Sequence, residues 1–178
     1  MRLFATRTPA RRLARRLIRC ERGQELVEFT MTVPILMIVV FGLLEVGMLL
    51  DVGHSMAGLS REGANIAARG TSLDSVVQIT MANGGTMGIG ARGGAIATRL
   101  RIEGGFPVVE SQFASGGVVG LSRLGHPGDS VSALATTGLL DGQSYFVVEL
   151  FLAYQPFTPL SRMVGSIVPD TLYDRSIF

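Results

Sequence analysis

A long apolar stretch near the N-terminus constrains this 178-residue chain more than any other feature. Residues 29–44 include no charged side chain, and the apolar region extends from Leu26 to Leu50, over about 25 positions. A helix of about 20 residues rises about 30 Å, enough to cross the hydrocarbon core of a bilayer. The alternative is a buried core helix, but the Gly-rich remainder is small for enclosing a helix that is apolar on all sides. We therefore expect a transmembrane helix over residues 24–50.

The basic residues are concentrated before this stretch. All sixteen are Arg, and the first 23 positions hold eight of them with one acid, whereas from Gln24 onward eight Arg face thirteen Asp or Glu. Positive charge on one flank of an apolar segment favours a cytoplasmic location for that flank. We therefore expect a cytoplasmic N-terminus and an exported remainder. A basic arm can also bind nucleic acid, but the adjacent membrane segment explains it better, so we expect no nucleic-acid partner.

The usual cleavage signals are missing from this segment. No pattern of small residues follows the apolar stretch, where residues 45–48 read Glu-Val-Gly-Met. Cys20 precedes the stretch, whereas a lipoprotein signal has its cysteine after the apolar run. As the one cysteine in the chain, it allows no internal disulfide. The junction before the stretch reads Arg22-Gly23-Gln24, and Gly23 has no Cβ to obstruct a protease cleft.

A basic leader that ends in Gly, followed by an apolar helix with Glu at its fifth position, resembles a prepilin. The wider sequence resembles the TadE-like proteins of Flp/Tad pilus systems, in residues 23–29 (GQELVEF), 33–34 (VP), 42–45 (GLLE), 60–64 (SREGA) and 154–160 (YQPFTPL). The resemblance implies a minor pilin or pseudopilin that acts non-enzymatically in pilus assembly in the inner membrane. It also implies cleavage between Gly23 and Gln24 by a prepilin peptidase. The implied partners are that peptidase, other pilin-like subunits, the inner-membrane pilus platform and membrane lipid.

Glu28 is the residue that we most expect to act in subunit assembly, with Phe29 beside it. Cleavage would leave a new α-amino group on Gln24, one helical turn from the Glu28 carboxylate. A carboxylate within a membrane is costly unless it is paired, and this amine is an available partner. The resemblance implies that the pair sets the register between subunits; alternatively, Glu28 lies at the headgroup boundary. For Glu45, an interfacial position and a buried contact between subunits both stay open.

Residues 51–94 are predicted to form the end of the long helix, a second helix and a loop. The helical pattern lasts to Arg69, so residues 51–70 continue the membrane helix, in which Pro34 is expected to introduce a kink. A second, short helix is expected from Thr71 or Ser72 to residue 83, followed by a Gly-rich loop over 84–94.

The rest of the chain predicts a small antiparallel sheet. Alternating residues around Gly104-Gly105 predict a β-hairpin over 95–114, whose first strand is half-buried. Residues 144–154 are the best candidate for a central strand, residues 115–142 read as loops, and the C-terminal stretch with its three prolines is expected to be irregular or briefly helical. The fold class is therefore α+β, and residues 71–178 form the exported α+β domain.

Three patterns suggest chemistry that their context does not support. Residues 53–57 (GHSMA) approximate a hydrolase nucleophile elbow but follow a membrane helix. Residues 88–93 (GIGARG) match a dinucleotide fingerprint but lead into a strand pattern. His54 and His126 lack the spacing of zinc ligands. We expect no catalytic residue, no cofactor and no metal. The main alternative function is a permanently anchored, exported binding domain with neither cleavage nor a filament role.

Overall fold

A computed structural model describes residues 21–118, 121–132, 140–158 and 169–178. The expected basic leader therefore lies almost entirely outside the described residues. The chain separates into two compact units, Met1–Glu45 and Val46–Phe178.

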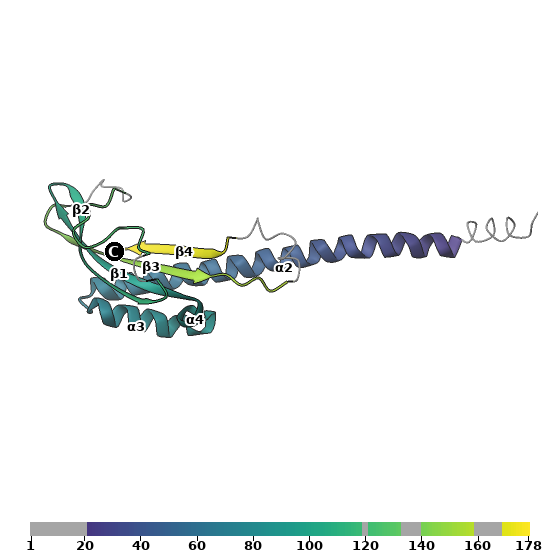
Figure 1. The fold of residues 1–178 in the computed structure, drawn as a ribbon, viewed down its shortest axis with the longest axis horizontal. Helices are drawn as coiled ribbons and strands as arrows, with labels where there is room; N and C mark the ends of the chain where they lie inside the picture. The colour runs from purple at the N-terminus through teal and green to yellow at the C-terminus, as the bar shows by residue number, and fades with distance from the viewer. Residues whose placement is uncertain (1–20, 119–120, 133–139, 159–168) are drawn as a thin grey trace, which may run out of the picture. The chain divides into compact units, whose positions relative to one another are not determined.

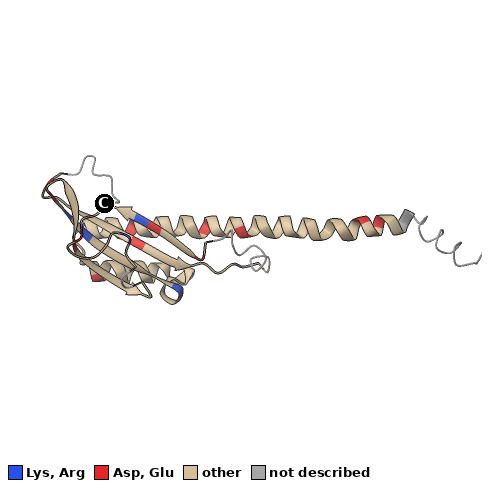
Figure 2. Cartoon of the chain, turned by 45° about the horizontal axis from the view of Figure 1, so that its top comes forward, with Lys and Arg blue, Asp and Glu red and all other residues tan. Residues whose placement is uncertain are grey.

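Helix α2 spans Glu21–Ala68 and contains both the predicted membrane segment and its predicted continuation. It ends one residue before the expected Arg69, and Gly70 follows with a φ of +93°. Pro34 lies within the helix, which continues on both sides of it. Figure 2 shows the long stretch of α2 that carries no charge.

Four antiparallel strands form the sheet: β1 (Gly93–Glu103), β2 (Phe106–Gly116), β3 (Ser144–Ala153) and β4 (Thr171–Ile177). Their order is β2-β1-β3-β4 (Figure 1). Gly104 and Gly105 join β1 to β2 with φ values of +60° and +80°, which glycine adopts without steric cost. The predicted hairpin and the central position of the 144–154 strand are both confirmed, and so is the α+β class.

The expectation of an irregular C-terminal stretch is wrong for residues 171–177, because they form β4. Leu172 pairs with Leu152 and Arg175 with Glu149 across the β3–β4 ladder. The prolines on which the expectation rested lie before the strand, and Pro169 does not interrupt Thr171–Ile177. Proline excludes only the positions where a ladder needs its N–H.

The expected Gly-rich loop is also wrong in part. Helix α3 (Leu73–Asn83) ends where predicted, with Ser72 as its N-cap. It is followed by a 3₁₀ helix, η1 (Gly84–Met87), and by the single turn α4 (Ile89–Arg92). Ile89 is fully buried in the core. The burial of this one side chain explains why the segment is ordered despite its glycines.

Both faces of the sheet are covered. On one face lie the Val46–Ala68 part of α2 and α3 (Figure 1), with a core of buried side chains: Met56, Ala64, Ala67, Val76, Val77, Ile89, Ala95, Ala97, Val148, Leu150 and Leu152. On the other face, Val118, Leu124 and Val131 cover apolar side chains of β1, β2 and β3. The first strand is therefore buried on both faces over most of its length, rather than half-buried as the alternation predicted.

Candidate functional site

The first candidate site is the apolar surface of α2 in the Met1–Glu45 unit. Twelve large apolar side chains between Leu26 and Leu44 are 46–70% exposed. Within the described residues, α2 is the one helix that is long and apolar enough to cross a membrane. A surface of this kind is stable when lipid tails or the helices of other subunits cover it.

The four predicted site residues, Gly23, Gln24, Glu28 and Phe29, lie together on the first turns of α2. All four are exposed, and Phe29 is 68% exposed. Gln24 and Glu28 are four residues apart and therefore share a helix face. The Gly23–Gln24 bond lies within the first turn of α2, so a protease would have to unwind this turn to reach the bond. Their roles in cleavage and assembly stay predictions.

The polar side chain of Thr30 within this segment is satisfied by its own helix. The Thr30 Oγ1 lies 2.9 Å from the carbonyl oxygens of both Leu26 and Val27. Such back-bonding lets a hydroxyl enter lipid without an unsatisfied donor. Farther along α2, the Glu45 side chain is only 7% exposed, so it is already buried in a single chain.

A buried polar contact joins α2 to the last strand. Ser60 is fully buried; its hydroxyl donates a hydrogen bond to the Asp174 carboxylate, and its Oγ lies 2.9 Å from the Ser176 Oγ. Asp174 and Ser176 both belong to β4. Sequence reasoning assigned Ser60 no role. The signal available in the sequence was that Ser60 lies four residues from each of two apolar residues, Met56 and Ala64, and so shares a helix face with them.

On the opposite face of the sheet, Glu149 is a buried acceptor for three donors. Its side chain is fully buried in β3, and it accepts hydrogen bonds from the Ser122 Oγ at 2.5 Å, the Arg123 N–H at 3.0 Å and the Tyr173 hydroxyl at 2.8 Å. The Arg123 guanidinium carbon lies 3.9 Å from the centroid of the Tyr173 ring. Burial, together with the Glu149 carboxylate, raises the pKa of Tyr173.

This Glu149 cluster was also missed from the sequence. The signal was a single acid inside the apolar run Phe146–Leu152, where a charge is costly unless it is hydrogen-bonded. The cluster fixes the segment of Ser122 and Arg123 onto the sheet. Three hydrogen bonds from two separate segments to one buried carboxylate suit this arrangement to holding the fold.

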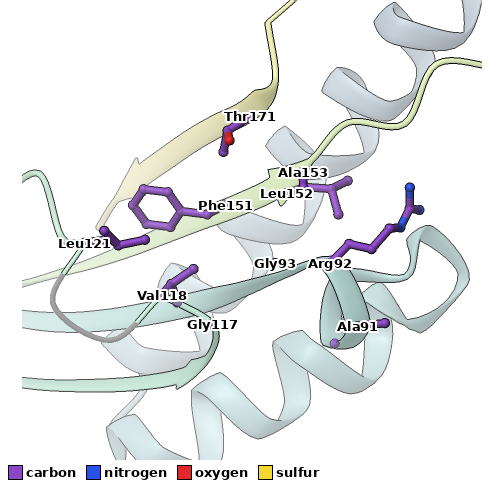
Figure 3. Close-up of a pocket in the computed structure, with 11 residues that line it drawn as sticks. Ala91, Arg92, Gly93, Gly117, Val118, Leu121, Phe151, Leu152, Ala153 and Thr171 are labelled. Carbon is purple, nitrogen blue, oxygen red and sulfur yellow. The ribbon is translucent and has the colours of Figure 1, made fainter.

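Two cavities lie near α4. A largely apolar one of about 310 Å³ lies between Val118, Leu121 and Phe151 on one side and residues 90–93 on the other (Figure 3). A more polar one of about 380 Å³ lies between α2 and α4, and Arg92 contributes to both.

The sequence patterns that resemble enzyme and metal-site signatures do not have the local structure that such sites require. Residues 53–57 are internal to α2, so Ser55 lies on a continuous helix and not on a strand-to-helix turn. In residues 88–93, a helix leads into a strand, the reverse of the order that a dinucleotide site needs. Within the described ranges, no three His, Cys, Asp or Glu side chains lie close enough together to hold a metal ion.

Comparison with known families gives a match that lies within α2. A family model described as TadE-like protein matches residues 23–65. The resemblance to TadE-like proteins is thus confirmed over this segment. The TadE-like match begins at Gly23, the first residue of the predicted cleavage site, and it ends within the part of α2 that packs on the sheet. It suggests a part in Tad pilus assembly. No curated protein and no solved structure matches the chain.

Proposed function

We propose that this protein is a minor pilin or pseudopilin that acts in the assembly of a Tad/Flp-type pilus without catalysing a reaction. In this proposal α2 spans the inner membrane over residues 24–50, with the N-terminus in the cytoplasm. Residues 51–70 continue α2 outside, and residues 71–178 form the exported α+β domain. The observation that carries the proposal is the coincidence of an exposed apolar helix with a TadE-like match that starts at Gly23.

The proposed maturation step is hydrolysis of the Gly23–Gln24 peptide bond by a prepilin peptidase. The new α-amino group of Gln24 then lies one turn from Glu28 on the same helix face. In a bilayer, a neighbouring subunit's amine can neutralise the Glu28 carboxylate, which is otherwise costly to place there. Phe29 and the apolar side chains that follow it supply the packing surface between subunits, and the pilus platform is the further partner.

The deciding experiment is to determine the N-terminal residue of the protein purified from membranes of its own organism, by intact mass and terminal peptide mapping. We expect Gln24. An N-terminus at Met1 would contradict the processing step and would favour the alternative function, an uncleaved anchor for an exported binding domain.

A further inference from the structure

The polar cavity beside α4 lies next to the end of the apolar stretch. Its α2 wall includes Met48, Asp51 and Ser55, and Asp51 directly follows Leu50, where the apolar region ends. The rise from Asp51 to Ser55 is about 6 Å, comparable to the headgroup layer on one side of a bilayer, which is about 5–8 Å thick. All the residues that line the cavity belong to the Val46–Phe178 unit.

Arg92 brings an available cation to this cavity. Its Nη2 donates a hydrogen bond to the Met87 carbonyl oxygen at 2.6 Å. Among the described residues it makes no ion pair with a carboxylate. Figure 3 shows the Arg92 side chain extending away from Phe151 and Leu121, which line the neighbouring apolar cavity. A guanidinium has five N–H donors, so most of them stay free for a ligand.

The other groups around the cavity restrict the ligand. Asp51 supplies the one carboxylate, and Ser55 and Thr86 supply hydroxyls. A guanidinium matches the geometry of a phosphate and can bind two of its oxygens at once. The Asp51 carboxylate repels a second negative charge and attracts an ammonium group. One cation and one anion around the same cavity therefore fit a ligand that carries both charges.

We propose that this cavity binds the headgroup of a zwitterionic phospholipid, with the phosphate on Arg92 and the amine toward Asp51. The cavity volume of about 380 Å³ lies within the range of small-molecule sites. The inference rests on the membrane insertion in the proposed function, which brings the cavity to the headgroup layer. It does not depend on leader cleavage or on assembly into a pilus.

The test is native mass spectrometry of the full-length protein in detergent, after incubation with either phosphatidylethanolamine or phosphatidylglycerol of the same acyl chains. We expect the wild-type protein to retain one phosphatidylethanolamine in preference to phosphatidylglycerol. Arg92→Gln removes the cation and should lower this retention about tenfold. Ser55→Trp should lower it similarly, because the indole would fill the cavity from an exposed helix position.

Two matched variants control for charge and for bulk. Arg69→Gln removes an exposed Arg 18 residues beyond Asp51 along the chain, about 27 Å at helical rise. His54→Trp adds the same bulk at the exposed position beside Ser55, outside the cavity lining. Both should retain the lipid as the wild type does.

Retention that is unchanged in Arg92→Gln and Ser55→Trp would overturn the site. Equal retention of phosphatidylglycerol by the wild-type protein would overturn the zwitterionic assignment. The N-terminal residue separates this inference from the proposed processing. An N-terminus at Met1, together with lipid retention that depends on Arg92, would refute processing alone. An N-terminus at Gln24, together with no such lipid retention, would refute the headgroup site alone.

Discussion

Gly63 lies where α2 packs closely against α3 and β3. A Cβ at this position would lie 2.7 Å from the Thr80 Oγ1 of α3 and 3.4 Å from both methyl groups of Val148 in β3. Thr80 is 2% exposed and Val148 is fully buried, so neither side chain has room to move. Overpacking of this kind costs about 1–3 kcal/mol.

Gly63→Ala also gains helix propensity, which offsets up to about 1 kcal/mol of that cost. Gly58 lies in the same helix, and a Cβ there would meet nothing within 4 Å. Gly58→Ala is therefore the matched control, and it should stabilise the protein by the propensity alone. The difference between the two variants isolates the steric cost, about 1–3 kcal/mol. At about 3 °C per kcal/mol, Gly63→Ala should melt about 3–9 °C below Gly58→Ala.

The assay is thermal unfolding of the full-length protein in detergent, followed by tyrosine near-UV circular dichroism. All three Tyr lie in the Val46–Phe178 unit, so the signal reports that unit. A third variant, Thr80→Ala, removes the atom that the new Cβ would meet, and the double variant Gly63→Ala/Thr80→Ala should recover most of the loss. Equal melting temperatures for Gly63→Ala and Gly58→Ala would refute the close approach.

Four further predictions test the membrane segment and the Glu149 cluster. Gly23→Leu should leave a species longer by 23 residues, visible by intact mass; a mass equal to that of the processed wild type would contradict cleavage at this bond. Glu28→Ala should insert into membranes but abolish piliation, whereas Glu25→Ala, one turn earlier and equally exposed, should not; normal pili with Glu28→Ala would refute the pairing role. Glu149→Gln deprives at least one of the three donors to this buried side chain of its acceptor and should cost about 1–3 kcal/mol in urea unfolding, a loss absent if the cluster does not form. The raised pKa of Tyr173 means that the folded state favours the protonated phenol, so the contribution of Tyr173 to stability is complete below about pH 10 and is lost as the pH rises above it. Tyr173→Phe should therefore show a shallower fall in melting temperature above pH 10 than the wild type. Parallel pH profiles of the two proteins would contradict the raised pKa.

The sequence predicted those elements whose formation depends on residues close together in the chain. The uncharged run of residues 29–44, the helix start after Ser72 and the Gly104-Gly105 turn are each indicated by a few neighbouring residues, and all three were found. Strand β4 was missed because its stabilising partners are in β3 and α2, far away in the sequence. The short helices after Asn83 were missed because the burial of Ile89 overrides the preference of glycine for loops.

The residues of the candidate sites also divide into those that the sequence could predict and those that only the tertiary structure shows. Gly23 and Glu28 could be identified because their spacing along one helix resembles a known motif. The Glu149 cluster and the Arg92 cavity could not, because each combines residues from three or more separate segments. A lone acid in an apolar strand indicates that partners must exist, but only the tertiary fold shows that they are Ser122, Arg123 and Tyr173.

The contact between Ser60 and β4 also determines when the domain can finish folding. The partners of Ser60, Asp174 and Ser176, are 114 and 116 residues away, so the contact forms only after the chain up to Ser176 is available. Contacts of such long sequence separation slow folding, because a large loop must close first. Until β4 docks, both Ser60 and Glu149 lack partners that they have in the finished fold. With residues 71–178 exported as proposed, the domain would therefore stay incompletely folded until β4 had crossed the membrane, and premature proteolysis would be concentrated in that interval.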